Sequence, residues 1–326
     1  MVGFEKITVA EIPNIHVGQV ENKDAATGVT VFLADDKNGM AAGVSVKGGG
    51  PAARESQLLD PKAAATSIHA LVLGGGSAFG LDAAGGVMKY LEKHGIGFDV
   101  GVTKVPLVCQ SDLFDLTVGD MSVRPNAEMG YQACIAAMNK NYKDGNYGAG
   151  CGATVGKMAG MEYCMKAGIG SYVVRKGDLI VGAVVAVNAL GDIYDYHTNE
   201  KIAGLLSEDK TSFRNTTELM YGSYAPIENK FVENTTIGAI ITNAAFDKSQ
   251  LCKIADMAHN GYARSIKPLH TSADGDTIYA LSVGNVKADQ DMIGTLAADV
   301  MSEAIIAAVK SAESAYGYPS HTEMTM

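Results

Sequence analysis

The chain has 326 residues, of which 47% are apolar and 19% charged, so it can bury a sizeable core and is not a disordered protein. Its net charge of −10 argues against nucleic acid or an anionic membrane surface as the main partner. Glycine is unusually frequent, with 38 residues and no collagen-like period, so we expect it in ordered turns and close backbone contacts. The five cysteines form no CxxC motif and the N-terminus lacks a signal-peptide pattern, which predicts a cytoplasmic protein without a disulfide framework or zinc site.

The first half of the chain predicts a hairpin followed by a strand and a helix. Residues 28–34 and 40–46 flank Asp-Asp-Lys-Asn-Gly, which is a hairpin signal. A short buried strand at His69–Leu73 leads through a run of glycines into a helix that Ser77 would cap and Gly95 would end.

The second half continues the mixture of hairpins and helices. We expect a helix at Asn126–Asn141, a hairpin at 171–176 and 179–188, a strand at Ile237–Thr242, and helices at Ser249–Ile266 and Asp291–Tyr316. The polar region 207–233 is expected to be a surface loop or an interdomain connection. This mixture favours α+β layers over a doubly wound parallel sheet.

Two glycine-rich segments are candidate ligand sites. Gly74–Gly80 matches neither the Walker pattern nor GxGxxG, and Phe79 stands where GxSxG needs its last glycine, so tight helix–strand packing is the alternative to a phosphate cradle. Gly148–Lys157 also fails as a P-loop, because Met158 replaces the required Ser or Thr. Lys157 is therefore either a solvated side chain or a cation delivered to a site by a tight turn.

Asn234 and Thr235 stand at the junction between the polar region and the apolar strand. A hydroxyl residue at such a junction is what an N-terminal nucleophile requires. Cleavage before Thr235 would leave it with a hydroxyl and a free α-amine whose reference pKa of about 7.7–8.0 suits a base near neutral pH. The alternative is an ordinary turn pair.

Asp274 and Asp276 flank a single glycine and could point into one pocket, where like charges would raise the pKa of one carboxyl. The alternative is an Asp-rich turn. His259 and His270 could join these carboxylates at a metal, but no HExxH spacing supports this, and we expect neither metal nor cofactor.

In order and spacing, these segments resemble the self-processing aminopeptidase/amidase family of the DmpA type, which includes β-aminopeptidases, L-aminopeptidase/D-amino-acid esterases and endo-type nylon-oligomer hydrolases. The likeness extends from about Gly18 to about Lys310. Its carriers are Thr27–Val31, Gly48–Glu55, Gly74–Leu81, Phe114–Leu116, Gly148–Lys157, Ala186–Asn188, Asn234–Ile237, Ala258–Gly261, His270–Thr271 and Asp274–Asp276. The resemblance implies a four-layer αββα sandwich, shared with ornithine acetyltransferase relatives and convergent with the N-terminal nucleophile hydrolases.

The same resemblance implies that residues 1–326 form one folded unit that cleaves itself between Asn234 and Thr235. The products would be an α chain, 1–234, and a β chain, 235–326, that stay together and assemble into homo-oligomers of αβ units.

Further residues follow from the matched motifs. Thr235 would be the nucleophile, Asn188 the side-chain donor to the oxyanion, and Asp274 and Asp276 the acidic pair that orients Thr235 and its amine. Lys157 matches a lysine of the nylon-hydrolase branch and would balance charge.

One position departs from the family pattern. Phe114 stands where family enzymes place a catalytic tyrosine, so either the alignment slips there or that hydrogen bond is absent; Tyr131 and Tyr147 are nearby in sequence. We expect Phe114, Gly76 and Ser77 to line the substrate pocket.

The expected function is hydrolysis of small peptides or ω-amino-acid amides, with no nucleic acid or membrane partner. Two alternatives stay open. One is an acyltransferase of the ornithine acetyltransferase type, although its glycine-methionine signature before the nucleophile is missing. The other is a non-catalytic small-molecule-binding module built on the two glycine loops.

Overall fold

The computed structural model describes residues 1–222 and 234–325, and its largest element is a six-stranded sheet. All its neighbouring strands pair antiparallel except β16 and β18, which are parallel. In spatial order the strands are β1 (Glu5–Ile7), β12 (Ile169–Lys176), β13 (Leu179–Asn188), β16 (Thr235–Ala244), β18 (Thr277–Val286) and β4 (Ala41–Val46). Every residue of β16 is buried, as expected for a central strand rich in Ile, Thr and Ala.

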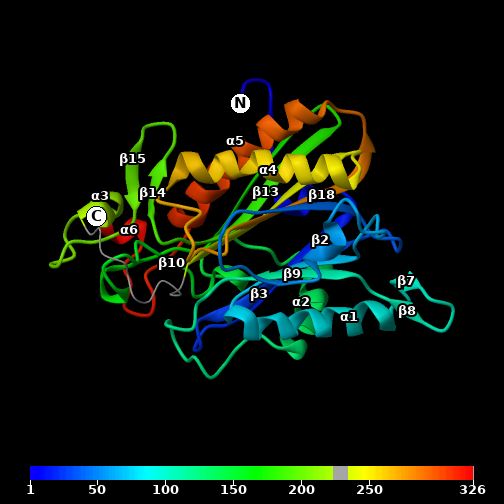
Figure 1. The fold of residues 1–326 in the computed structure, drawn as a ribbon, viewed down its shortest axis with the longest axis horizontal. Coiled ribbons are helices and arrows are strands. Elements are labelled where there is room, and N and C mark those ends of the chain that lie inside the picture. The colour runs from blue at the N-terminus through cyan, green and yellow to red at the C-terminus, as the bar shows by residue number, and fades with distance from the viewer. Residues whose placement is uncertain (223–233, 326) are drawn as a thin grey trace.

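A five-stranded sheet stacks against it, as Figure 1 shows. Its strands in spatial order are β2 (Ile15–Asn22), β3 (Thr27–Ala34), β6 (Ala70–Gly74), β9 (Val108–Asp112) and β5 (Ala52–Arg54). Side chains from the facing surfaces of both sheets, including Phe32, Leu71, Ile237 and Tyr279, form one buried core between them.

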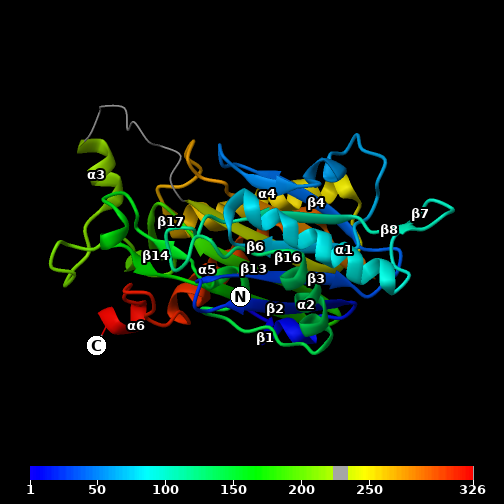
Figure 2. The ribbon, with the colours of Figure 1, turned by 90° about the horizontal axis from the view of Figure 1, so that it is seen from below.

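Two pairs of helices cover the outer faces of the sheets (Figures 1 and 2). The helices α4 (Lys248–Ser265) and α5 (Gln290–Lys310) pack on the six-stranded sheet, and α1 (Ala83–Lys93) and α2 (Ala127–Met138) pack on the five-stranded sheet. The layer order is therefore helix, sheet, sheet, helix, which confirms the expected α+β, four-layer αββα sandwich.

Smaller elements lie at the two ends of the sandwich. One end carries the sheet of β15 (Glu200–Ala203), β14 (Asp192–Asp195) and β17 (Ile266–Lys267), with α3 (Thr216–Gly222) and α6 (His321–Met324). The hairpin of β7 (Phe98–Asp99) and β8 (Lys104–Val105) projects from the other end, and β10 (Thr154–Val155) pairs with β11 (Met165–Lys166). Short 3-10 helices span Val9–Glu11, Ser56–Leu59, Ser77–Asp82, Gly148–Gly150 and Met161–Tyr163.

The hairpin expected at 28–34 and 40–46 is wrong in its pairing. The strands β3 and β4 exist, but β3 pairs with β2 and β6 while β4 pairs with β18 in the other sheet. The Asp-Asp-Lys-Asn-Gly turn therefore carries the chain from one sheet to the other. The hairpin at 171–176 and 179–188 is confirmed, with Lys176 opposite Leu179.

The expected helices occur with altered ends. Ser77 does not cap α1; it begins a 3-10 helix and has a left-handed φ of 54°. The helix expected at Asp291–Tyr316 is α5, which ends at Lys310. The polar region expected to be irregular contains α3, and its residues 223–233 lie outside the described part of the chain.

The helix α5 is long and apolar enough to cross a membrane by length and composition alone, but 72% of its most apolar window is buried inside the protein. It occupies the place of a core helix, packed against α4 and the six-stranded sheet.

Candidate active site

Thr235 is the first residue of β16 and is buried, with Asn234 immediately before it. The Thr235 hydroxyl donates to the carbonyl oxygen of Asn234 at 2.5 Å. The backbone N–H of Gly275 donates to the same oxygen at 3.0 Å. The carbonyl group that self-cleavage would attack therefore contacts both the candidate nucleophile and a fixed backbone donor.

Asn188 lies directly opposite Thr235, because the antiparallel register of β13 and β16 pairs the two residues. Its side-chain Oδ1 accepts from Lys157 Nζ at 2.7 Å and from the Thr154 N–H at 3.0 Å. Its Nδ2 donates to the main-chain carbonyl of Phe114 at 2.9 Å. The orientation of this buried amide is therefore fixed on both sides.

Lys157 reaches the site as the end of the second glycine-rich segment. It is buried, and its ammonium also donates to the Asn188 carbonyl oxygen at 3.2 Å. Two possibilities were predicted for Lys157, a solvated side chain or a cation held in a site. The structure favours the second, because the side chain is buried against Asn188.

Asp276 holds the backbone beyond the nucleophile. Its Oδ1 accepts from the Thr236 N–H at 2.8 Å, and its Oδ2 accepts from His270, at 3.1 Å from the backbone N–H and 2.8 Å from Nδ1. The parallel ladder of β16 and β18 begins only at Ile237 and Thr277. The Asp276 carboxylate therefore supplies the acceptor for Thr236 just before the ladder begins.

Asp274 is buried next to Asp276, and its Oδ2 accepts from the Thr271 N–H at 2.5 Å. Burial raises the pKa of Asp274 to about 6, and the negative charge of Asp276 adds to the effect while the Lys157 ammonium opposes it. Asp274 is therefore a site carboxyl with a raised pKa, chiefly because it is buried and secondly because a like charge lies beside it.

The glycines Gly48 and Gly50 hold this acidic turn in place. The Gly50 N–H donates to the Asp274 carbonyl at 2.8 Å, and the Gly48 N–H donates to that of Asp276 at 3.2 Å. A Cβ atom on Gly48 would lie only 2.3 Å from the Asp274 carbonyl oxygen. Part of the glycine excess is thus explained by close backbone approach beside the site.

The expected pocket residues Phe114, Gly76 and Ser77 lie on the Asn188 side of the site. The contact of Phe114 with Asn188 is made by its backbone carbonyl. This contact does not depend on whether the side chain at position 114 carries a hydroxyl. The Ser77 N–H donates to the Leu113 carbonyl at 3.0 Å, which ties the first glycine-rich segment to the chain beside Phe114.

Sequence reasoning missed Asp115, although it belongs to the Phe114–Leu116 motif. Its Oδ1 accepts from the Gly76 N–H at 2.7 Å, and burial raises its pKa to about 6. Asp115 therefore links the glycine turn at Gly76 to the segment that holds Asn188.

Lys166 was also missed, and no local motif marks it. It is completely buried, and its ammonium donates to the carbonyls of Gly150, Ala153 and Ala167 at 3.3, 2.9 and 2.5 Å. Burial lowers its pKa to about 7. Lys166 therefore stabilises the backbone of the second glycine-rich segment by donating to the carbonyls of Gly150 and Ala153.

The rings of His259 and His270 lie 4.7 Å apart, edge to face. In residues 1–222 and 234–325, no group of three or more His, Cys, Asp or Glu side chains is placed to hold a metal ion. His270 is instead a hydrogen-bond partner of Asp276.

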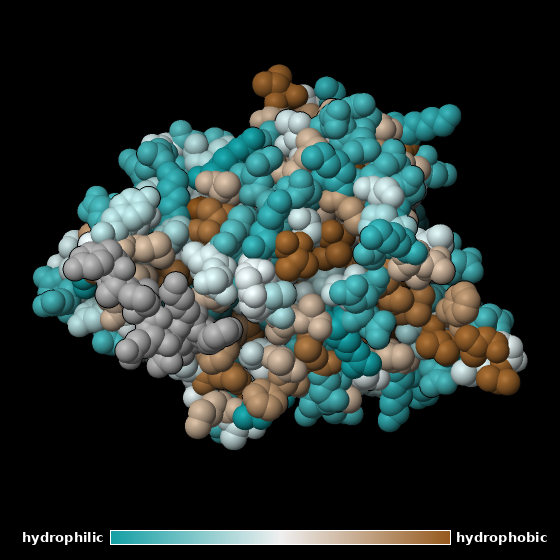
Figure 3. Space-filling view, in the orientation of Figure 1, coloured by the Kyte–Doolittle hydropathy of each residue, from teal (hydrophilic) through white to brown (hydrophobic). Residues whose placement is uncertain are grey.

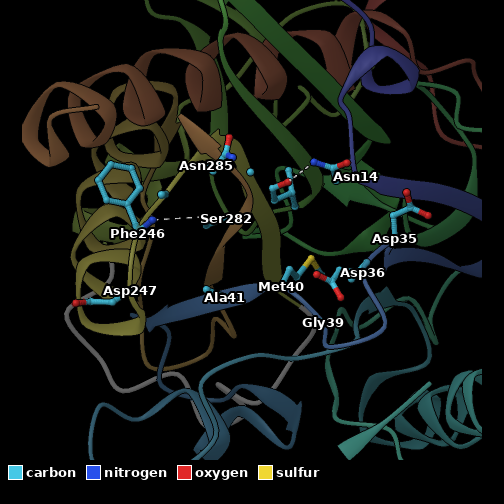
Figure 4. A pocket seen from close by; sticks show the side chains of 14 residues that line it. Asn14, Asp35, Asp36, Gly39, Met40, Ala41, Phe246, Asp247, Ser282 and Asn285 are labelled. Atoms are coloured by element: carbon cyan, nitrogen blue, oxygen red, sulfur yellow. Dashed lines mark hydrogen bonds between the residues drawn. The ribbon is translucent and has the colours of Figure 1, made fainter. Parts of the chain in front are cut away.

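A cavity of about 870 Å³ lies at the opposite end of the six-stranded sheet, where β16 and β18 end (Figure 4). Asp36, Asp247 and Asn285 are among the side chains that line it. The ten residues of β16 separate its two ends by about 30 Å, so this cavity is remote from Thr235.

Comparison with known proteins places this arrangement in a family. Residues 7–323 match the model of peptidase family S58, and the chain belongs to that family. It is a hydrolase of peptide or amide bonds with the N-terminal nucleophile hydrolase type of fold.

Named relatives and solved structures agree with this assignment. An uncharacterized aminopeptidase of Mycobacterium leprae (strain TN) is 35% identical, over 97% of this chain and 94% of that protein. A 6-aminohexanoate-oligomer endohydrolase of Kocuria sp. (strain KY2) is 26% identical, over 92% and 85%. The L-aminopeptidase D-Ala-esterase/amidase of Ochrobactrum anthropi shares the fold with a TM-score of 0.69 at 15% identity, covering 93% of this chain and 86% of that one. A Burkholderia sp. β-aminopeptidase gives 0.66 at 20% identity, covering 97% and 91%.

Proposed function

We propose that this protein is a self-processing amide hydrolase that cleaves its own Asn234–Thr235 bond and then uses Thr235 as the nucleophile. The observation that carries the proposal is the 2.5 Å contact between the Thr235 hydroxyl and the Asn234 carbonyl oxygen, with the Gly275 N–H on the same oxygen. The family match supports amide hydrolysis and favours neither acyl transfer nor non-catalytic binding.

Self-cleavage would proceed by an N-to-O acyl shift. Thr235 Oγ1 attacks the Asn234 carbonyl carbon, and the Gly275 N–H stabilises the developing oxyanion. The C–N bond then breaks, the hydroxyl proton passes to the Thr235 nitrogen, and an ester remains. Water hydrolyses the ester and releases the Asn234 carboxylate, the hydroxyl and the new α-amine.

In turnover the same hydroxyl attacks a substrate amide while the α-amine takes its proton. We assign Asn188 as an oxyanion donor, because its amide is held in one orientation by Lys157 and Phe114. Asp274 and Asp276 orient Thr235 and its amine. Gly76, Ser77 and the Phe114 segment line the substrate pocket on the Asn188 side.

For the substrate class we propose small peptides or ω-amino-acid amides, since the named relatives include an aminopeptidase and a 6-aminohexanoate-oligomer endohydrolase. A panel of p-nitroanilides, β-amino amides and 6-aminohexanoate oligomers assayed on the processed protein separates these possibilities.

We further propose a cytoplasmic homo-oligomer of αβ units formed from one folded unit. All five cysteines are free thiols, which suits a reducing compartment. The β7–β8 hairpin exposes Phe98, Val100 and Val102, whose side chains belong to an apolar area at one end of the molecule (Figure 3). Such an exposed patch suits contact with another subunit, and sedimentation of Val102→Asp beside the unchanged protein tests it.

Intact mass and N-terminal sequencing of purified protein test self-cleavage directly. We expect fragments of about 24 and 10 kDa, by proportion of chain length, and a new N-terminus at Thr235. Thr235→Ala should stay a single inactive chain, whereas Thr235→Ser should still be cleaved. An uncleaved chain after long incubation, or amide hydrolysis by Thr235→Ala, would overturn the proposal.

A further inference from the structure

The residue that follows the nucleophile is held at both ends of its backbone. The Thr236 N–H donates to Asp276 Oδ1 at 2.8 Å, and the hydroxyl of Tyr262 on α4 donates to the Thr236 carbonyl at 3.3 Å. The Thr236 N–H belongs to the peptide group between Thr235 and Thr236, so its hydrogen bond to Asp276 holds that group, while the Tyr262 bond holds the next one. The backbone that carries the Thr235 side chain is thereby fixed beside the Asn234 carbonyl.

His270 in turn fixes the carboxylate that holds Thr236. Both its backbone N–H and its ring Nδ1 contact Asp276 Oδ2, at 3.1 and 2.8 Å. A carboxylate only accepts, so the ring must carry its proton on Nδ1. The backbone of His270 is left-handed, with φ of 55°, which turns both donors toward the same oxygen.

Two aromatic side chains of α4 face the His270 ring. On α4, the ring of His259 packs edge to face on His270, and its Nε2 contacts the Ser45 carbonyl at 3.1 Å. Burial lowers the pKa of His259 to about 4, so this neighbour is neutral at physiological pH. Tyr262 also faces His270, with ring centroids 6.2 Å apart.

The remaining charges near this pair lie on other elements. Lys47 and Asp256 form an ion pair at 2.6 Å close to His259, and Asp274 lies beside Asp276. The Lys47 ammonium is thus already paired, and the contact that bears on Thr236 is the hydrogen bond from His270 to Asp276.

We propose that His270 is a positioning residue for self-cleavage: by donating from Nδ1 to Asp276, it fixes the Thr236 amide and so aims Thr235 at the Asn234 carbonyl. The inference rests on the proposed function, because it assumes that Thr235 attacks that carbonyl. His270 is thus a further residue of the site, besides those to which the proposed function already assigns a role.

The test compares variants that tolerate the left-handed backbone. His270→Asn keeps an N–H₂ donor, His270→Asp has the same shape but no donor, and His270→Gly removes the side chain without backbone strain. The matched control is His197→Ala. The exposed imidazole of His197 contacts the Glu303 carboxylate at 2.8 Å, and this pair lies away from Thr235. First-order self-cleavage is followed by pulse-chase of freshly translated full-length chain between pH 5 and 8, with thermal unfolding of each variant.

We expect His270→Gly and His270→Asp to cleave about tenfold more slowly than the unchanged chain, which corresponds to loss of about one hydrogen bond. His270→Asn should cleave within about threefold of the unchanged chain with the same pH profile, since a neutral donor suffices. His197→Ala should cleave normally. If the Gly variant does not fold, the Asn and Asp pair still decides the matter.

Equal rates for the Asn and Asp variants, fast or slow, would overturn the inference, and so would a normal rate for a folded Gly variant. These outcomes leave the proposed function standing. An unchanged chain that never cleaves, or a Thr235→Ala chain that does, overturns the proposed function instead, so the two failures are distinguishable.

Discussion

Asn188 and Thr235 lie directly opposite each other in the register of β13 and β16. The pairing brings an oriented amide and the candidate nucleophile to the same end of the central sheet from distant parts of the chain. The amide depends on Lys157, whose ammonium is 2.7 Å from Asn188 Oδ1. The Lys157 ammonium, which belongs to neither β13 nor β16, therefore fixes the orientation of the Asn188 amide.

Replacing Lys157 with Met should lower kcat for amide hydrolysis by about 10–100-fold, because the Asn188 amide loses its strongest partner and its aim at the oxyanion. The pKa of Asp274 should also rise further, since the Lys157 ammonium now lowers it. Steady-state kinetics across pH measures both effects. Lys104→Met is the control, because Lys104 pairs with Asp99 on the exposed β7–β8 hairpin; kcat and pH profile equal to those of this control would contradict the prediction.

Contiguous motifs in the sequence indicated the candidate site residues, whereas contacts between distant segments could not be predicted. Thr235 stands at a visible junction of polar and apolar sequence, and Asp274 and Asp276 are separated by one glycine. Lys166 has no such signal, because its importance arises only when three carbonyls converge on its ammonium.

The same limit explains the error in strand pairing. The turn between β3 and β4 was recognised, but a turn signal does not reveal whether the next strand stays in the same sheet. The partner of β4 is β18, which lies far along the chain. Hydrophobic patterning alone could not choose between this pairing and a hairpin, because it indicates that a strand forms but does not identify its partner.

Asp274 should give turnover and stability opposite pH dependences. Burial raises its pKa to about 6 from the ordinary value of 3.8, so the folded state favours the protonated acid. Its stabilising contribution is therefore complete below pH 3.8 and is lost as pH rises through 6. Turnover should instead rise through about pH 6, because the carboxylate is a stronger hydrogen-bond acceptor for the Thr235 amine than the protonated acid.

Asp274→Asn separates these effects. The variant should lose about 10²-fold in kcat and lack the activity limb near pH 6, while its unfolding free energy should no longer carry the Asp274 contribution between pH 4 and 6. Kinetics and urea unfolding across pH are the measurements. A limb near pH 6 that persists in the variant would assign it to another group.

Gly275→Ala should slow self-cleavage by about 10²-fold, because the added Cβ would lie 2.8 Å from Thr235 Oγ1 and must displace the hydroxyl from the Asn234 carbonyl. Pulse-chase of the full-length chain gives the rate. Gly85→Ala in α1 is the matched control, since nothing lies within 4 Å of its new Cβ, and it should cleave normally. Normal cleavage by folded Gly275→Ala would show that the hydroxyl has more room than the structure gives it.

Lys166→Met should destabilise the fold by an amount that grows with pH. Burial lowers the pKa of Lys166 to about 7 from 10.5, so above pH 7 the folded state holds a neutral amine while the unfolded chain holds an ammonium. The contribution of Lys166 to stability is full above pH 10.5 and is lost as pH falls through 7. Methionine fills a similar volume but leaves the carbonyls of Gly150, Ala153 and Ala167 without this donor.

Urea unfolding at pH 7 and pH 9, in a Thr235→Ala background that keeps both proteins as single chains, measures the difference. At pH 9 we expect Lys166→Met to be less stable by about 2–4 kcal/mol, the cost of unpaired buried carbonyls, and the gap should shrink by about 1 kcal/mol per unit toward pH 7. Titrating groups that do not interact with the Lys166 charge contribute equally to both proteins and cancel; Cys151 and Asp115 do interact with it. A gap that is constant with pH would mean that Lys166 stays an ammonium in the fold, held by its three carbonyls throughout.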